Sequence, residues 1–206
     1  LGLSDIHFDA MPFSMFKNRN FLDIGCATGM LIEHMQKKGW TTTGVDLCDE
    51  SAEYGIKTRG VDIRTGTLGD ASFPDEHFSV VHFSHLIEHV PDPRAFLDEV
   101  WRILTPGGYA IVTTPNAQGF QARLFGNKWR SAIADHLFLF TRRTLKDLLL
   151  SCGFSIMKTV TWGGLAAGTA PGWLKNFMDK SAKRFGFGDV MLFLAQKLER
   201  GSSGSK

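Results

Sequence analysis

The first residues suited to chemistry lie in a glycine turn that follows a short apolar run. The turn reads Asp-Ile-Gly-Cys-Ala-Thr-Gly over residues 23–29, and an apolar helical pattern comes directly after it. A strand, a glycine turn and a helix together form a nucleotide-binding geometry. The dinucleotide pattern GxGxxG would need further glycines where the chain has Ala27 and Met30. The turn therefore favours a nucleotide-type ligand other than a dinucleotide, and a plain structural turn is the alternative.

Two carboxylates lie at the ends of the first two apolar runs. Asp23 is placed where a negative charge repels a pyrophosphate but offsets the charge of an ammonium or a sulfonium group. Asp46 ends the second run, at the position where an acidic side chain accepts hydrogen bonds from ribose hydroxyls. Its alternative role is to cap the next helix, for which Asp49 and Ser51 are better placed. We therefore expect Asp46 to bind a ribose.

A parallel sheet is needed to bring these residues together, and the sequence supplies its elements. Short β-type runs alternate with helical patterns, which is typical of βαβ units covered on both faces. We expect strands at residues 21–24, 41–46, 61–64, 78–84, 109–114, 154–160 and 190–196. We expect helices at residues 28–38, 50–58, 93–104 and 141–151. The fold class is therefore α/β, a doubly wound seven-stranded sheet with helices on both faces.

The length and composition of the chain limit its possible domain organisation. The chain has 206 residues, of which 43% are apolar and 21% charged, so we expect one domain over residues 1–200. Irregular insertions interrupt it at 115–136 and 163–188, and residues 201–206 (GSSGSK) resemble an appended tail or a fragment boundary. The net charge of +2 offers no basic surface for nucleic acid. No segment resembles a signal peptide or a membrane span, so we expect a cytoplasmic protein.

Short motifs occur along the chain in a characteristic order. After the glycine turn come GVD at 44–46, FPDEHF at 73–78, LIEHVPDP at 86–93, LTPGG at 104–108, TPN at 114–116, DHLFLFT at 135–141 and LLLSCGF at 148–154. With them, residues 21–160 resemble the class I S-adenosylmethionine (SAM)-dependent methyltransferases, in particular small bacterial-type members similar to ubiquinone-biosynthesis O-methyltransferases. The resemblance implies a Rossmann-like sheet with an antiparallel last strand, SAM as cofactor and S-adenosylhomocysteine as product.

The resemblance also implies which residues hold the cofactor. They are Asp23, Gly25, Cys26, Ala27 and Gly29 for the methionine half, Asp46 and Leu47 for the ribose and one adenine face, and Thr67 and Leu68 for adenine, with Asp70 as an alternative. Ala27 stands where the family more often has glycine, which tightens the turn. Ser84 and His85, after the fourth strand, are expected near the methyl group being transferred.

Methyl transfer needs a base only when the acceptor starts protonated, and a neutral imidazole suits that role. Our catalytic candidates are His85 and His136, and a hydrogen-bonded structural histidine is the alternative for each. We expect the acceptor to be a small molecule methylated at oxygen. Phe120, Phe125 and Trp129 could enclose it and Asn116 could orient it. A SAM-binding subunit without activity and a nicotinamide-dependent oxidoreductase are the alternatives.

Two further patterns are given simpler interpretations. His85–His89 matches the zinc motif HxxEH, but Pro91 ends the segment and no third ligand is evident. A weaker metal interpretation remains, because some ubiquinone-biosynthesis O-methyltransferases resemble this stretch with a carboxylate where His85 stands. Magnesium prefers oxygen ligands, so the histidine argues against a magnesium site here. The cysteines form no CxxC pair, so we expect no metal. The basic amphipathic stretch at 172–185 could contact a membrane or a lipid-linked acceptor, or simply pack on its own domain.

Overall fold

In the computed structural model of this chain, the described residues are 18–163 and 186–198, together with residues 3, 4, 6, 8, 11 and 16. The strands are β1 (Asn20–Ile24), β2 (Thr41–Asp46), β3 (Ile63–Thr65), β4 (Phe78–Ser84), β5 (Leu104–Pro115), β6 (Phe154–Trp162) and β7 (Val190–Lys197). The helices are α1 (Met30–Lys37), α2 (Asp49–Arg59), α3 (Pro93–Ile103), α4 (Phe120–Phe125), the short 3₁₀ helix η3 (Gly126–Lys128) and α5 (Arg142–Ser151).

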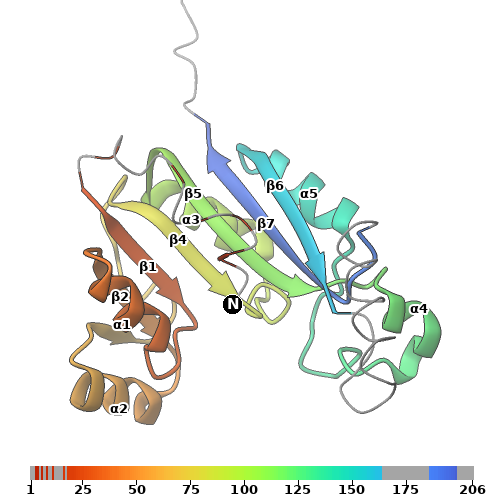
Figure 1. The fold of residues 1–206 in the computed structure, drawn as a ribbon, viewed down its shortest axis with the longest axis horizontal. Helices are drawn as coiled ribbons and strands as arrows, with labels where there is room; N and C mark the ends of the chain where they lie inside the picture. The colour runs from red at the N-terminus through yellow and green to blue at the C-terminus, as the bar shows by residue number, and fades with distance from the viewer. Residues whose placement is uncertain are drawn as a thin grey trace, which may run out of the picture.

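The strands form one sheet in the order β3-β2-β1-β4-β5-β7-β6. Neighbours from β3 to β5 are parallel, whereas β7 is antiparallel to both β5 and β6. In Figure 1 the arrow of β7 accordingly points against those of β5 and β6. The expected seven-stranded doubly wound sheet with an antiparallel last strand is confirmed. Its parallel part aligns the carboxyl ends of β1, β2, β3 and β4 along one edge.

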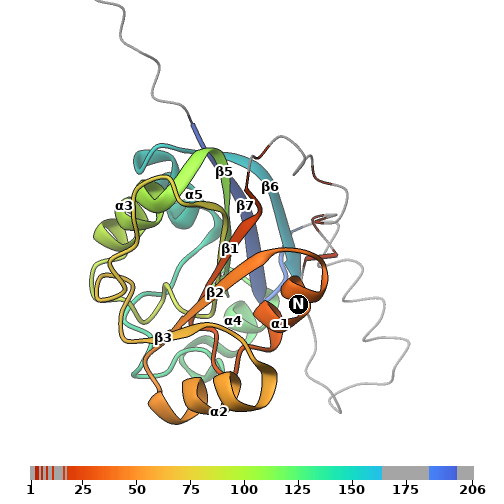
Figure 2. The same ribbon diagram turned by 90° about the vertical axis from the view of Figure 1, so that its left-hand side faces the viewer.

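Each face of the sheet buries its own hydrophobic core. Neighbouring residues of a strand point to opposite faces, so Phe21 belongs to one core and Leu22 to the other. The core on the Leu22 side includes side chains of α3 and α5, and the core on the Phe21 side includes side chains of α1 and α2. Figure 2 shows α3 and α5 on one side of the sheet and α1 on the other.

Helix α3 forms where its sequence pattern places it. The carboxylate of Asp92 accepts hydrogen bonds from the backbone N–H groups of Arg94 and Ala95, both at 3.0 Å, and so caps the first turn. Pro93 occupies the first turn, where no N–H is needed. The helix ends at Ile103 and passes directly into β5.

The structure differs most from the sequence expectation in two places, while β3 and β6 are shifted or extended by two residues at one end. Strand β5 begins at Leu104 rather than at residue 109, because Leu104 already pairs with Phe78, before a register shift between Phe78 and Val80 of β4. The segment expected to be irregular contains α4 and η3, whose few residues are too short to show a helical period. The stretch at 172–185 lies outside the described residues. Among the described helices, none is both long and apolar enough to cross a membrane.

Candidate functional site

A cavity of about 340 Å³ lies at the carboxyl ends of the first strands, a size within the range of small-molecule sites. Its lining residues are Ile24, Gly25, Val45, Asp46, Leu47, Gly66, Thr67, Leu68, Leu86, His89, Val90, Pro91 and Phe96. Five of them, Gly25, Asp46, Leu47, Thr67 and Leu68, are expected cofactor residues. The other expected site residues, Asp23, Cys26, Ala27, Gly29, Ser84, His85 and His136, do not line this cavity.

Asp46 joins two loops at the mouth of the cavity. One carboxylate oxygen accepts a hydrogen bond from the backbone N–H of Ala27 at 2.6 Å, and the other accepts from that of Cys48 at 2.9 Å. A carboxylate has about four acceptor positions, so two remain for a ligand. The carboxylate is therefore fixed in place while it can still accept hydrogen bonds from the cavity side.

The glycine turn is shaped by three residues with positive φ. Gly25 and Gly29 both have a φ of 73°, and Ala27 has 48°. Alanine rarely adopts this conformation, and the bond from its N–H to Asp46 holds it there. A Cβ on Gly29 would lie 2.8 Å from the side chain of Val61, so that position cannot take a larger residue without a shift. Gly29 is also the N-cap of α1, so the turn leads directly into that helix.

Cys26 is buried beneath the turn. Its Sγ would lie 2.5 Å from a Cβ built on Gly44, so the sulfur fills the space that this glycine leaves. Burial raises the pKa of the thiol to about 12, and the nearby carboxylates of Asp23 and Asp46 add to the increase. The thiol therefore stays protonated and acts as a packing group.

Asp23 forms a buried pair with His82. Its carboxylate lies 2.7 Å from Nδ1 of His82 on the neighbouring strand, where the two residues are partners in the ladder. Both side chains are almost fully buried. This pair places a carboxylate behind the glycine turn. The sequence around His82 does not indicate this contact, because it depends on the pairing of two strands that lie far apart along the chain.

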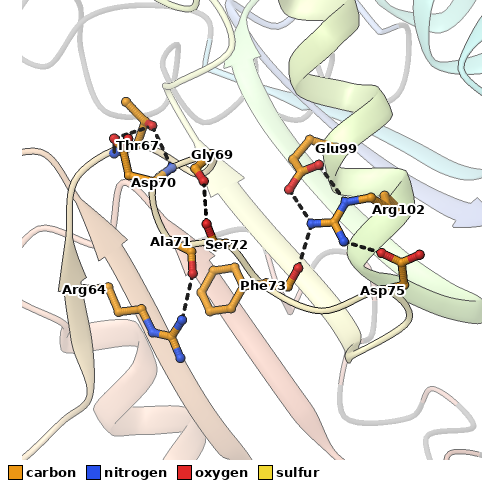
Figure 3. A network of polar contacts seen from close by, with 10 residues as sticks. All are labelled: Arg64, Thr67, Gly69, Asp70, Ala71, Ser72, Phe73, Asp75, Glu99 and Arg102. Atoms are coloured by element: carbon orange, nitrogen blue, oxygen red, sulfur yellow. Dashed lines mark hydrogen bonds and ion pairs between the residues drawn. The ribbon is translucent and has the colours of Figure 1, made fainter.

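The loop after β3 carries Leu68 to the cavity wall and is held by its own polar groups (Figure 3). The backbone N–H and the hydroxyl of Thr67 both donate to the carboxylate of Asp70, at 2.9 and 2.6 Å. These bonds, that of the hydroxyl first, lower the pKa of Asp70. The Asp70 carboxylate is thus engaged within its loop, while Thr67 and Leu68 line the cavity.

Two arginines tie the same loop to the rest of the fold (Figure 3). Arg64 donates to the carbonyl of Ala71 at 2.9 Å and lies 4.5 Å from the centre of the Phe73 ring. Arg102 of α3 donates to the carbonyl of Phe73 at 2.7 Å. The loop is therefore anchored on both sides before β4 begins.

The end of β4 carries a histidine beside a buried carboxylate. His85 has a φ of 53°, an uncommon conformation for a non-glycine residue, and its side chain is half-exposed. Its Nδ1 lies 3.4 Å from Glu88, which is almost fully buried and accepts a hydrogen bond from the Thr114 hydroxyl at 2.8 Å. Burial acts to raise the pKa of Glu88, but the contacts with His85, its own backbone and Thr114 outweigh it and lower the pKa.

The segment after η3 brings His136 to the same region. The rings of His136 and His89 meet edge to face with centroids 4.7 Å apart. Their Nδ1 atoms lie 2.7 and 2.8 Å from the backbone carbonyls of Ser131 and Asp135, respectively. Together with Glu88, these two histidines place three potential metal-ligating atoms within 4.8 Å of one another. The sequence places Glu88 and His89 in the HxxEH stretch and names His136 separately, and the fold brings the three side chains together.

Other expected acceptor residues occupy different environments. Asn116 is fully buried; it donates to the carbonyl of Gly188 at 2.8 Å and accepts from the backbone N–H of Gln118 at 3.1 Å. Its amide is therefore already used to hold backbone. Trp129 is 4% exposed, whereas Phe125 is 49% exposed. Of these side chains, Phe125 is the one that offers a large apolar surface to solvent.

Comparisons with known proteins give a consistent result. A family model described as a methyltransferase domain matches residues 7–159. The chain is 35% identical over 120 residues to the ubiquinone biosynthesis O-methyltransferase of Parvibaculum lavamentivorans, covering 53% of this chain and 46% of that protein. It is 34% identical over 135 residues to that of Maricaulis maris, covering 60% and 52%. The chain thus spans about half the length of the curated relatives it matches.

Solved structures share the fold at lower identity. A putative methyltransferase from Bacillus halodurans superposes with a TM-score of 0.70 at 17% identity, covering 96% of this chain and 99% of that one. A SAM-dependent methyltransferase from Mesorhizobium loti gives a TM-score of 0.69 at 15% identity, covering 96% and 98%. At such low sequence identity, the structural similarity shows that the fold is shared and nothing more.

The buried thiol of the glycine turn gives the first prediction. A pKa of about 12 leaves roughly one Cys26 thiol in ten thousand ionised at pH 8, and only the thiolate reacts with iodoacetamide. We expect the exposed Cys48 to be alkylated in the folded protein and Cys26 only after unfolding. Peptide mapping by mass spectrometry measures both. The Cys48→Ser variant is the control, and rapid labelling of Cys26 in that folded variant would contradict this account.

Proposed function

The chain belongs to the methyltransferase domain family, and on that premise we propose that it transfers the methyl group of SAM to an oxygen atom of a small-molecule acceptor. The observation that carries the proposal is the fixed carboxylate of Asp46 at the cavity, since a ribose needs such an acceptor at the end of β2. Oxygen as the methylated atom is supported by the curated relatives, which are named ubiquinone biosynthesis O-methyltransferases.

The shape and chemistry of the cavity support SAM as the cofactor. Leu47, Leu68 and Phe96 provide apolar walls of the kind that a purine ring requires. Gly25 forms part of the wall. A Cβ built on it would lie 3.7 Å from the side chain of Leu86, so the missing side chain leaves space for a ligand beside the backbone. The residues present therefore fit adenosine, with Asp46 for the ribose and the glycine turn for the methionine part.

The work of this chain in the reaction is to position groups rather than to form covalent bonds. Bound SAM supplies a methyl carbon that is already activated for displacement. Asp46 is held by two backbone N–H groups before any ligand arrives, so little reorganisation is needed when a ribose binds. The anchored loop after β3 holds Leu68 in the same way.

His85 is the proposed base for a protonated acceptor. Its Nδ1 faces the carboxylate of Glu88, which favours the tautomer with a proton on Nδ1 and a free lone pair on Nε2. Its position at the carboxyl end of β4 places it beside the cofactor edge, and half of its side chain is exposed to receive an acceptor. His136 is less suited, since its ring packs against His89.

The cofactor assignment predicts the effect of removing the Asp46 carboxylate. Asp46→Ala should weaken SAM binding by about 1.5–3 kcal/mol, which raises the Kd about 10- to 150-fold, because hydrogen bonds to a charged group are lost. Isothermal titration with SAM and S-adenosylhomocysteine measures this, and circular dichroism confirms that the variant folds. Asp49→Ala, an exposed carboxylate at the start of α2, is the matched control. An unchanged Kd in folded Asp46→Ala would exclude the ribose role.

The activity itself is tested by a panel of acceptors. Phenols and catechols should give O-methyl products with SAM, detected by mass spectrometry, whereas amines should give none. His85→Ala should lower kcat by about 10²–10⁴-fold, the range for loss of a general base, with the SAM Kd unchanged. His77→Ala, an exposed histidine before β4, should keep parent activity. Products methylated only at nitrogen would contradict the proposal, and so would SAM binding without transfer to any acceptor.

A further inference from the structure

A buried polar pair interrupts one of the two hydrophobic cores. On the face of the sheet that carries Phe21, the ladder between β1 and β4 pairs Phe21 with Val80, and both side chains are fully buried. Two residues further along, on the same face, the partners are Asp23 and His82. Their Oδ1 and Nδ1 atoms lie 2.7 Å apart, and each side chain is 7% exposed. A carboxylate only accepts hydrogen bonds, so Nδ1 of His82 is the donor.

Packing alone does not require this pair. Taking a carboxylate out of water is costly, and an apolar pair of similar volume is often as stable or more stable. Phe21 and Val80 show that the same two strands accommodate such an apolar pair one step earlier. The place at which the pair holds its carboxylate therefore explains it better than the core does.

The carboxylate of Asp23 lies close to the glycine turn. Cys26 of that turn belongs to the core on the same face of the sheet, and the charge of Asp23 contributes to the raised pKa of its thiol. Ile24 and Gly25, which follow Asp23 directly, line the cavity. The carboxylate is thus beside the part of the cavity wall that the glycine turn forms.

Asp23 and Asp46 lie on neighbouring strands at different depths. Asp23 is the ladder partner of Gly44, and Asp46 follows Gly44 by two residues. Their backbones are therefore about 5 Å apart across the sheet and about 7 Å apart along it. A ligand whose ribose binds Asp46 needs only a short chain across the glycine turn to reach Asp23. The amino-acid part of SAM is such a chain, and it carries an ammonium group that a carboxylate attracts.

His82 fixes one oxygen of Asp23 and leaves the other available. Its hydrogen bond goes to Oδ1, and no hydrogen bond to Oδ2 is found in the part of the chain that the structure describes. The ring of His82 stacks on that of Phe21, with centroids 6.4 Å apart and an interplanar angle of 20°. The donor is therefore itself held in place, and it determines the direction in which the carboxylate points.

We propose that His82 is a positioning residue, which holds the Asp23 carboxylate so that its second oxygen faces the ammonium group of SAM. This inference rests on the proposed function, because it takes SAM as the ligand. His82 acts through Asp23 and does not itself contact the cofactor. The pair accordingly contributes to the binding of ligands that carry the amino-acid chain, whereas Asp46 and Leu47 bind the adenosine part.

Two cofactor fragments test this role without turnover. S-adenosylhomocysteine carries the amino-acid chain, whereas methylthioadenosine keeps the adenosine and the sulfur but lacks that chain. Isothermal titration of the full chain gives the Kd of each. In His82→Phe, which keeps a ring but loses the N–H donor, the Kd of S-adenosylhomocysteine should rise by about tenfold, because Asp23 is no longer held. The Kd of methylthioadenosine should stay within about twofold, because its contacts lie at Asp46 and Leu47.

Further variants separate positioning from packing. His82→Asn places an amide N–H at the position of Nδ1 and should restore most of the affinity for S-adenosylhomocysteine. Asp23→Asn, which keeps the shape of the pair, should weaken S-adenosylhomocysteine but not methylthioadenosine, and adding His82→Phe to it should have no further effect. Val80→Ala removes volume from the same core and is the structural control. It should lower the melting temperature but leave both Kd values within about twofold.

Circular dichroism establishes that each variant folds. An unchanged ratio of the two Kd values in folded His82→Phe or Asp23→Asn would overturn the positioning role. An equal loss of both ligands in His82→Phe, or a failure of His82→Asn to restore affinity, would overturn it as well. A parent chain that binds neither ligand would instead overturn the proposed function, and the role of His82 with it, so the two failures are distinguishable.

Discussion

The edge of the sheet that carries the cavity depends on one carboxylate that holds two loops at once. Asp46 accepts the N–H of Ala27 from the turn after β1 and the N–H of Cys48 from its own turn. Without this bridge, the positive φ of Ala27 has no compensating contact, since alanine disfavours that conformation. The bridge also sets the distance between the glycine turn and Leu47. The two hydrogen bonds of Asp46 thus determine both the shape of the cavity and the position of the carboxylate within it.

Parallel strand pairing makes that bridge possible. Strands β1 and β2 are in register from Asn20 opposite Thr41 to Ile24 opposite Val45, so their carboxyl ends stop at the same level. On the other side of β1, β4 ends beside it and delivers His85 and Glu88 to the same edge. Residues from separate motifs therefore become neighbours because the sheet aligns the points where its strands end.

The sequence predicts most of the sheet and five of the residues that line the cavity, because both are encoded locally. Strand alternation, the helical period of α3 and the glycine turn are visible within windows of a few residues, and Asp46 follows from its place at a strand end. Contacts between distant segments are not encoded in this way. The Asp23–His82 pair and the approach of His136 to His89 depend on strand order and on the path of a long segment. The hydrogen bond from the Asn116 amide to the carbonyl of Gly188 also joins segments that are far apart along the chain.

A crystal structure with S-adenosylhomocysteine bound would test whether Asp46 and the edge around it form the cofactor site. We expect both ribose hydroxyls within hydrogen-bonding distance of the Asp46 carboxylate, and the adenine ring between Leu47 and Leu68. We also expect the bonds from Ala27 and Cys48 to Asp46 to persist. A ribose bound away from Asp46, or an adenine outside the cavity at the ends of β1 to β4, would contradict the account.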